Sequence, residues 1–434
     1  MKRFINPMPF NSAMLTNEQI KEILIEQREI MLKKALGVER GILKEVDKKI
    51  KLPHVIVLTG LRRSGKSTLL RQIIDKHYKN KDFFYVSFED ERLFNFPATE
   101  FNMVYEELVR LYGRKKTFFI DEIQNIKNFE IFVRRFYEDG FKFFITGSSA
   151  NLLSRELGTK LTGRHVDITL KPFSFKEFLK LRNFAFERDM IYKTENRAEI
   201  RSYFDEYLAK GGMPEYITYD DAELLARVYD DTVIKDIAVR HKIGNITELK
   251  ELYSFLITNS VNKFSFNSLK KIVHLGSVNT IKKYLSYLEE THFAKMVNKF
   301  DYSIKKQIIN DKKAYICDNG FITLLSKKIT KDKGWLLENL VFNSFNKNCE
   351  VFYYSGKKEC DFLLLENRKV IQAVQVCYEL SEDNKKREIS GLIEAMEKYH
   401  IKEGLILTYN QEDNLKIKKN KISIIPLWKW LLDR

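Results

Sequence analysis

The stretch Gly60-Leu61-Arg62-Arg63-Ser64-Gly65-Lys66-Ser67-Thr68 decides how the first half of this sequence folds. The apolar run Val55-Ile56-Val57-Leu58 precedes it, and apolar residues follow it at helical spacing: Leu69, Leu70, Ile73 and Ile74. This pattern predicts a buried strand, a glycine-bearing loop and a helix, the context of a Walker A signature. Glycines let such a loop wrap closely, so backbone N–H groups and the positive end of the helix point at phosphate oxygens.

The loop residues have predicted roles around a nucleotide. Lys66 would reach the β- and γ-phosphates, where it also counts as a catalytic candidate, and the Ser67 hydroxyl would bind Mg²⁺. Thr68, one residue further into the helix, would contact the α-phosphate or pack. The residues predicted to bind the nucleotide are Gly60, Arg63, Ser64, Gly65, Lys66, Ser67 and Thr68.

A second motif places two carboxylates at the end of a strand. The apolar run Thr117–Ile120 ends in Asp121 and Glu122, which is a Walker B pattern. An acid at the carboxyl end of a parallel strand beside the loop can hold Mg²⁺, and this is the role predicted for Asp121. Glu122 would polarise the attacking water, which separates a hydrolase from a nucleotide binder. The alternative for Glu122 is a solvated acid at a strand end.

Further candidates follow the next strand, residues 141–147. Ser148 or Ser149 could sense the γ-phosphate and orient water, with Asn151 as another candidate, while the alternative is a helix N-cap. Arg164 could face a nucleotide on its own or a neighbouring subunit as an arginine finger. An arginine at such a position is more often a member of a surface ion pair.

A guanine-reading pattern, N-K-x-D, occurs at Asn298-Lys299-Phe300-Asp301. It lies far beyond the predicted nucleotide core, and the run Asp121–Gln124 lacks the glycine that a GTPase switch needs. We therefore interpret the match as chance and expect ATP, with Mg²⁺, as the nucleotide.

Composition limits the class of protein. A chain of 434 residues with 44% hydrophobic residues predicts two or three domains with real cores. The net charge of +16 favours a polyanionic partner, nucleic acid before a membrane surface, although a lysine-rich proteome would give the same excess. The four cysteines form no C-x-x-C pair, which excludes a zinc ribbon or redox motif. Without a signal-like start or a spanning apolar run, we expect a cytoplasmic protein with no membrane partner.

Strands alternate with helices over residues 55–170, which predicts an α/β fold with a parallel, doubly wound sheet. The pattern then changes to helices and finally to a second, smaller α/β unit. The predicted units are an N-terminal helical segment (1–50), the nucleotide-binding core (51–175), a helical lid region (176–236), a winged-helix domain (237–333) and a nuclease-like domain (334–434).

The winged-helix prediction rests on a helix–turn–helix pattern over residues 268–288. Its second helix carries Lys282 and Lys283, and two later strands flank a basic tip, Lys305-Lys306, where a wing would meet phosphate. Such modules also serve as packing and protein-contact units, so DNA and a protein remain alternative partners.

The last unit carries part of a metal-dependent nuclease pattern. Glu338 lies in a predicted helix and Asp361 at the start of a predicted strand, which suits carboxylate ligands for Mg²⁺. Gln375 stands where a third acid is needed, and Cys377 stands where a lysine is needed. We therefore expect the fold of a restriction-endonuclease-like domain without its cleavage activity.

The chain resembles prokaryotic AAA+-like P-loop ATPases in which the core is followed by a winged helix and a nuclease-like domain of unknown function. The motifs that carry this resemblance are Gly60-x-Arg62-Arg63-x-Gly65-Lys66-Ser67, Phe119–Gln124, Thr146–Ser149, Leu161-x-Gly163-Arg164, Pro172-Phe173-Ser174-Phe175-x-Glu177-Phe178, Asp318-Asn319-Gly320 and Leu337-Glu338-Asn339-x-Val341. The resemblance covers nearly the whole chain. It implies ATP binding and hydrolysis and a regulatory, defence or DNA-related role.

The leading hypothesis is a Mg²⁺-dependent ATPase switch that is coupled to DNA or to a protein partner, with a homo-oligomer as one form. The alternative is a DNA-binding regulatory or defence protein in which ATP only modulates binding. The two differ in whether hydrolysis is needed for action.

Overall fold

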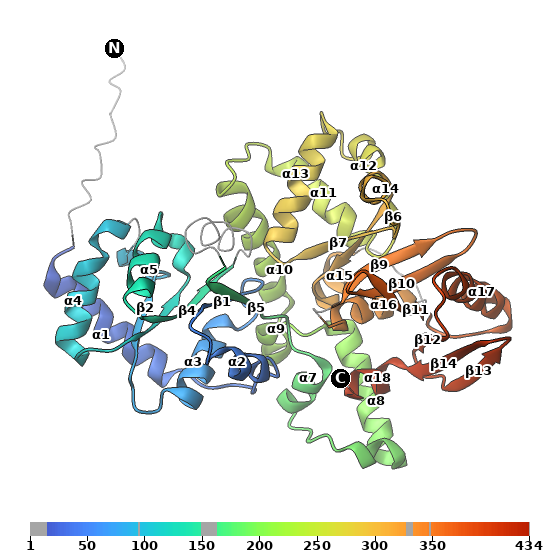
Figure 1. Cartoon of the computed structure of the whole chain (residues 1–434), viewed down its shortest axis with the longest axis horizontal. Coiled ribbons are helices and arrows are strands. Elements are labelled where there is room, and N and C mark those ends of the chain that lie inside the picture. The colour runs from blue at the N-terminus through green and yellow to red at the C-terminus, as the bar shows by residue number, and fades with distance from the viewer. Residues whose placement is uncertain (1–14, 94–95, 149–162, 327–332, 347–348, 434) are drawn as a thin grey trace.

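The structure is a computed structural model, and it describes residues 15–93, 96–148, 163–326, 333–346 and 349–433 (Figure 1). Its strands form a five-stranded, a three-stranded and a six-stranded sheet along the chain. The predicted fold class is confirmed, because a parallel P-loop NTPase sheet comes first and a helical region and a separate mixed sheet follow.

The five-stranded sheet has the order β2-β3-β4-β1-β5, and every neighbouring pair is parallel. Thr59 at the end of β1 is level with Gly147 at the end of β4. The segment after β1 therefore leaves from an interior strand at the carboxyl edge, and β4 lies between it and the end of β3. The strands are β1 (Val55–Thr59), β2 (Phe84–Ser87), β3 (Thr117–Asp121), β4 (Lys142–Gly147) and β5 (His165–Thr169).

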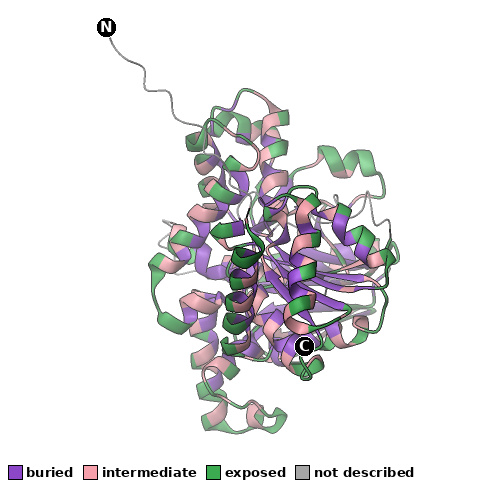
Figure 2. Cartoon of the chain, turned by 90° about the vertical axis from the view of Figure 1, so that its left-hand side faces the viewer, coloured by how far each residue is buried: buried purple, intermediate pink, exposed green. Residues whose placement is uncertain are grey.

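Helices cover both faces of this sheet, which explains why its strands read as continuous apolar runs. Val55 and Val57 face the core with α1, α4 and α5, whereas Ile56 and Leu58 face the core with α2 and α3. Figure 2 shows the buried strands enclosed by helices that are exposed on their outer sides. The helices are α1 (Asn17–Lys33), α2 (Leu43–Lys49), α3 (Lys66–His77), α4 (Phe101–Tyr112) and α5 (Phe129–Glu138), with short 3₁₀ turns at Glu91–Leu93, Ala98–Glu100 and Ile123–Asn125.

A helical region links this core to the three-stranded sheet. Its elements are α7 (Phe175–Leu181), a 3₁₀ turn (Arg188–Tyr192), α8 (Thr194–Lys210), α9 (Pro214–Tyr219), α10 (Ala222–Asp231), the π-helix η5 (Thr232–Val239) and α11 (Ile246–Thr258). The next elements are β6 (Lys263–Phe264), α12 (Phe266–Ile272), α13 (Val278–Glu290), β7 (Ala294–Asn298), α14 (Ile304–Ile309), β8 (Lys312–Ile316) and α15 (Asn319–Leu325). The three strands are antiparallel in the order β6-β8-β7. The segment between β7 and β8 is helical, where a basic wing tip was expected.

The C-terminal unit is a mixed six-stranded sheet with the order β13-β14-β12-β11-β10-β9. The sequence predicted a smaller α/β unit over residues 334–434 but not its strand order. Its elements are α16 (Gly334–Ser344), β9 (Glu350–Ser355), β10 (Glu359–Glu366), β11 (Lys369–Val376), α17 (Glu382–Lys398), β12 (Glu403–Thr408), β13 (Asp413–Ile417), β14 (Asn420–Pro426) and α18 (Leu427–Asp433).

One buried cluster runs through the helical region, the three-stranded sheet and one face of the C-terminal sheet. Polar residues of two resemblance motifs hold this junction together. The Asp318 carboxylate accepts hydrogen bonds from the backbone N–H groups of Gly212 (2.5 Å) and Gly320 (2.9 Å). Asn339 on α16 accepts from the N–H of Ile316 and donates to its carbonyl, both at 2.8 Å. These motifs therefore serve the architecture of the chain.

Candidate functional site

The β1–α3 loop, residues 60–65, has a backbone path that needs glycine at both ends. A Cβ on Gly60 would lie 2.3 Å from the Leu170 carbonyl oxygen, so no side chain fits there. Gly65 has a φ of +98° directly before α3, a conformation that L-residues with side chains rarely adopt. The loop thereby stays close to β5 while α3 starts at Lys66.

A cavity of about 540 Å³ opens in front of this loop. Of the residues predicted for the nucleotide site, the structure brings seven to its lining: Arg63, Gly65, Lys66, Ser67, Thr68, Glu122 and Ser148. Pro214, Glu215, Asp231 and Lys235 of the helical region line it as well. The cavity therefore lies between the carboxyl edge of the sheet and the helical region.

Lys66 is almost fully buried at the base of this cavity, with 4% of its side chain exposed. Its ammonium group donates to the carbonyl oxygens of Gly60 and Leu61 at 3.3 Å and lies 3.6 Å from the Glu122 carboxylate. All of these contacts come from the loop and the strand-end acid. A ligand anion at the loop would compete for the same ammonium group.

The two acids after β3 take different positions. Asp121 is buried beneath the loop, where it accepts a hydrogen bond from the Thr146 hydroxyl and lies 3.5 Å from the Tyr85 hydroxyl. Burial raises the pKa of Asp121, the Glu122 charge raises it further, and hydrogen bonds from Ser67 and Thr146 act against both. Glu122 has a φ of +50°, and this left-handed conformation directs its side chain into the cavity.

Thr146 links these two acids, and sequence reasoning gave it no role. Its hydroxyl oxygen accepts the backbone N–H of Glu122 at 2.9 Å while its hydroxyl donates to Asp121. A threonine near the end of one strand does not by itself predict, from sequence, a contact with the acids that end another strand. The register between β3 and β4 is what brings the three residues together.

Ser148 lies at the end of β4 and is 2% exposed. Its hydroxyl lines the cavity and has no hydrogen-bond partner among the described residues. A buried unsatisfied hydroxyl is costly and points to a missing polar ligand. The other candidates of this segment, Ser149 and Asn151, lie outside the described residues.

Arg164 lies away from the cavity within one chain. Its carbonyl accepts the N–H of Val55, the first residue of β1, so it sits at the sheet edge opposite the β1–α3 loop. Its guanidinium is exposed and lies 3.8 Å from the Glu138 carboxylate. The structure thus places Arg164 in a surface ion pair and does not bring it to the other candidates.

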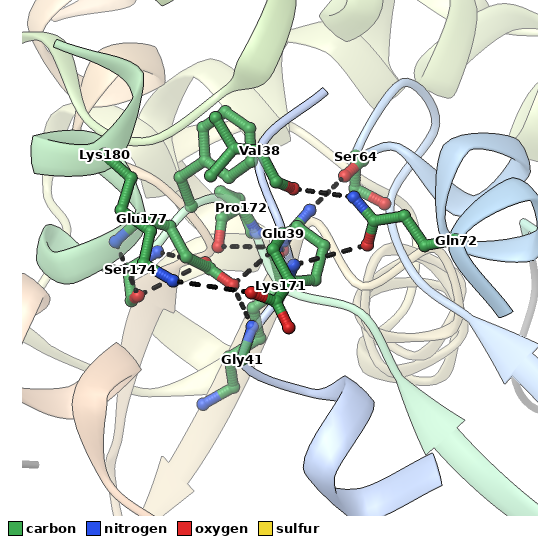
Figure 3. Close-up of polar contacts among 12 residues, drawn as sticks. Val38, Glu39, Gly41, Ser64, Gln72, Lys171, Pro172, Ser174, Glu177 and Lys180 are labelled. Carbon is green, nitrogen blue, oxygen red and sulfur yellow. Dashed lines mark hydrogen bonds and ion pairs between the residues drawn. The ribbon is translucent and has the colours of Figure 1, made fainter. Parts of the chain in front are cut away.

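A buried arginine that the sequence gave no reason to select supports the loop from behind. Arg40 donates to the Ser64 carbonyl at 2.9 Å, to the Lys171 carbonyl at 2.6 Å and to Glu177 at 3.1 Å. Figure 3 shows Ser64 and Glu177 in this network of polar contacts, together with Gln72 of α3. The network fixes the loop against the segment that follows β5.

Two arginines of the loop reach the helical region. Arg62 donates from two nitrogens to the buried carboxylate of Asp236 on η5, at 3.1 and 2.9 Å. Arg63 forms a more exposed ion pair with Glu215 at the start of α9, at 2.9 Å. Ion pairs therefore connect the loop to two helices outside the sheet, η5 and α9.

The nuclease-like candidates form a different kind of cluster. Lys313 of β8 lies among three carboxylates, with its ammonium 3.0 Å from Glu338, 2.9 Å from Glu359 and 3.5 Å from Asp361. Burial alone would lower the pKa of Lys313, but these carboxylates raise it above its ordinary value. The positive charge that Cys377 does not provide thus comes from a neighbouring unit, an arrangement that sequence spacing did not reveal.

The remaining positions of this cluster are also occupied by protein contacts. The Gln375 amide donates to Glu388 at 2.7 Å, and Asp361 accepts the backbone N–H of Val376 at 2.9 Å. In the part of the chain that the structure describes, no three His, Cys, Asp or Glu side chains are arranged to hold a metal ion.

Comparison with known proteins assigns the class. Residues 53–179 match the family described as AAA domain, and residues 201–332 match a domain of unknown function, DUF8612. The chain is 39% identical over 433 residues to the uncharacterized protein MJ1544 of Methanocaldococcus jannaschii, with 95% of each chain covered. It is 30% identical over 396 residues to an uncharacterized protein of Haemophilus influenzae, covering 87% of this chain and 94% of the other.

This chain is therefore an AAA+ P-loop protein by its first domain. It belongs to one family with the two uncharacterized proteins from M. jannaschii and H. influenzae. Among solved structures, AMPPCP-bound DnaA from Aquifex aeolicus is similar at 15% identity, with 58% of this chain and 88% of that chain covered and a TM-score of 0.23. A similarity this slight carries no argument about function. Within the described residues, no helix has the length and apolar character needed to cross a membrane.

Proposed function

We propose that this protein binds and hydrolyses ATP with Mg²⁺ at the cavity in front of the β1–α3 loop. The observation that carries the proposal is the convergence of Lys66, Glu122 and the unpartnered Ser148 hydroxyl on one cavity beside a glycine-framed loop. Buried cationic, acidic and donor groups that face a shared space suit a triphosphate and an attacking water.

The residues present fit both ligands. Glycine at positions 60 and 65 allows a backbone path that residues with side chains would not readily adopt, and this path ends at the start of α3, where backbone N–H groups can bind phosphate. Ser67 and Asp121 would hold Mg²⁺, because hydroxyl and carboxylate oxygens are its preferred protein ligands. Bound there, Mg²⁺ would neutralise developing charge on the phosphate oxygens.

The protein groups divide the chemical work. Lys66 would leave its carbonyl partners to contact the phosphates, and Ser148 would donate its unused hydrogen bond to them. Glu122 would then be free of the lysine and could accept a proton from water. Thr146 would hold the Glu122 backbone in place during this step.

The ion pairs of Arg62 and Arg63 support a switch in which nucleotide state reaches the helical region. Phosphate at the loop would attract both arginines and weaken their pairs with Asp236 and Glu215. The helical elements that carry these acids continue into the three-stranded unit. Arg164 lies at the sheet edge opposite the nucleotide cavity of its own chain. Its catalytic role would therefore be to contact a nucleotide bound to a neighbouring subunit.

The test uses two substitutions with distinct readouts. Lys66→Ala should abolish binding of a fluorescent ATP analogue, whereas Glu122→Gln should retain binding and lower turnover by about 10²- to 10⁴-fold. Lys76→Ala, on the exposed end of α3, serves as the matched lysine control. Unchanged turnover in Glu122→Gln removes the assignment of the base.

A second function, DNA binding with ATP as a modulator, is favoured by the exposed Lys282 and Lys283 on α13. Each phosphate contact should make the logarithm of affinity fall with the logarithm of salt concentration by a slope of about 0.9. Titration of a DNA duplex across salt concentrations tests this, and Lys283→Ala should reduce the slope. Absence of duplex binding at low salt excludes the function.

A further inference from the structure

Large apolar side chains lie exposed on and directly before α14, the short helix between β7 and β8. Tyr302 is 79% exposed, Ile304 72%, Ile308 55% and Ile309 69%. Singly exposed apolar residues are normal on protein surfaces, but a contiguous group marks an interaction site. In Figure 1, α14 lies beside α12 and β6, in the half of the molecule away from the five-stranded sheet.

The helix that carries these side chains is fixed by several polar contacts. The N–H of Ser303 donates to the Asp301 carboxylate at 2.9 Å, and the Gln307 side chain donates to the Asp301 carbonyl at 2.7 Å. At the other end, the Lys312 ammonium donates to the Gln307 carbonyl at 3.0 Å and lies 3.4 Å from that of Ile308. Hydrogen bonds thus hold the chain at both ends of this six-residue helix.

Residues that flank α14 in the chain contact neighbouring elements. Lys312 lies over the Phe266 ring of α12, 5.5 Å from its centroid, and Lys282 of α13 lies over the same ring at 5.2 Å. On the other side, the Tyr302 ring packs against Phe300 at 5.3 Å between centroids. Phe300 in turn packs against Tyr399 of the C-terminal unit at 5.2 Å. The chain is therefore anchored before and after α14, whereas no side chain of the helix itself is buried.

The charged residues on α14 itself, Lys305 and Lys306, are both positive and exposed. Lys305 is exposed on the helix and has no ion-pair partner among the described residues, while Lys306 lies only within 3.8 Å of Asp301. Lys282 of α13 lies over the Phe266 ring, and the exposed Lys283 follows it in the chain. A partner that covers the isoleucines would meet lysines around them. Carboxylates on the partner would therefore complement these lysines.

We propose that the α14 surface, defined as Tyr302, Ile304, Lys305, Ile308 and Ile309, docks a protein partner whose apolar groove or helix is flanked by acidic residues. Apolar anchors inside a charged rim are typical of protein interfaces. Aliphatic side chains offer no hydrogen-bond donors to phosphate, so they add little to DNA binding. A single capped turn of this length also presents too little apolar face for stable attachment to a lipid surface.

The test is direct binding to fluorescent probes in the absence of nucleotide. The first probe is a synthetic helical peptide with leucines at positions i, i+3, i+4 and i+7 flanked by glutamates, and the second has lysines in place of the glutamates. A short DNA duplex and phosphatidylserine-containing vesicles are the third and fourth. We expect the acidic peptide to bind, and the variant Ile304→Ser/Ile308→Ser/Ile309→Ser to weaken that binding on the order of tenfold or more.

Ile30→Ser is the matched control. Ile30 is 69% exposed and lies on α1, which packs on the five-stranded sheet. Both variants should retain the wild-type melting temperature and ATP turnover, since the substituted side chains are exposed and outside the nucleotide cavity. Failure of the acidic peptide to bind, or binding unaffected by the triple substitution, overturns the proposal. Loss of duplex or vesicle binding in the triple variant, without an effect on the peptide, assigns the surface to that other ligand. None of these outcomes depends on ATP hydrolysis.

Discussion

Among the residues that the structure describes, a buried lysine meets carboxylates at the β1–α3 loop and in the C-terminal unit, and the two sites differ in which polar groups lack a partner. At the β1–α3 loop, Lys66 lies 3.6 Å from one acid and shares a cavity with an unpartnered serine hydroxyl. In the C-terminal unit, Lys313 lies within 3.5 Å of three acids. Both lysines have 4% of their side chain exposed. The first arrangement suits an incoming anion, whereas in the second the ammonium group already has three carboxylate partners from the protein.

This difference teaches that acidic residues in a nuclease-like pattern do not by themselves predict metal chemistry. The cation at Glu338 and Asp361 is an ammonium group that belongs to β8. A buried charge that is paired and hydrogen-bonded within the protein is a structural feature until one partner is removed.

The largest expected effect on stability follows from Lys313→Met. This change leaves Glu338, Glu359 and Asp361 without their shared cation in a buried site, so the free energy of unfolding should fall by about 3–5 kcal/mol. Urea unfolding measures it. Lys263→Met is the control, because Lys263 pairs with Glu359 at the surface and its loss should cost about 1 kcal/mol or less.

A Mn²⁺ titration tests whether Lys313 or a metal ion holds these carboxylates together. Wild-type protein should show no change in melting temperature with Mn²⁺, because Lys313 holds the carboxylates. If Mn²⁺ raises the wild-type melting temperature, and Asp361→Asn removes that rise, the cluster is a metal site and the contrast with the nucleotide site fails.

Thr146→Val should have the next largest effect, on turnover. The valine keeps the shape but removes the hydroxyl that joins the Glu122 backbone to Asp121. We expect turnover to fall about 10- to 100-fold with ATP affinity changed far less, because the base loses its position while the phosphate contacts remain. Thr146→Ser, which retains the hydroxyl, should keep most of the activity. Equal losses in Val and Ser variants would show that packing, not the hydroxyl, matters.

These sites also show what could be predicted from sequence. The loop, the acids after β3 and the class of the sheet follow from local patterns, because a glycine spacing and a buried strand are contiguous in the chain. Arg40, Thr146 and Lys313 were missed because their partners lie far away in sequence, so only the tertiary fold brings them together. The sequence predicts a basic tip near Lys305 and Lys306, because that prediction rests on these lysines only. It does not consider the isoleucines of segment 304–309, which the structure places on one helix.

A smaller effect is expected from the pair of Arg62 and Asp236. A double-mutant cycle with Arg62→Ala and Asp236→Asn should give a coupling of about 1–2 kcal/mol in unfolding free energy without nucleotide, because the pair is bidentate and partly buried. With ATP bound in the Glu122→Gln background, the coupling should shrink as Arg62 turns to phosphate. The exposed pair of Arg227 and Glu223 is the control, and its coupling should be small with or without ATP. A coupling that ATP leaves unchanged argues against a role in switching.

Asp318 offers the subtlest test, because it is a buried carboxylate held by backbone N–H groups of Gly212 and Gly320. Burial raises the pKa of Asp318 to about 7. In the unfolded chain the carboxyl ionises near its usual value of 3.8, so between about pH 4 and 7 only the folded protein keeps the proton. Stability should therefore fall as pH rises through this window, by up to about 1.4 kcal/mol per pH unit, and level off above it. Asp318→Asn should flatten the profile, whereas Asp413→Asn, an exposed control, should not. If the profile of Asp318→Asn matches that of the wild type, the pKa of Asp318 is not raised in the folded protein, and the prediction is wrong.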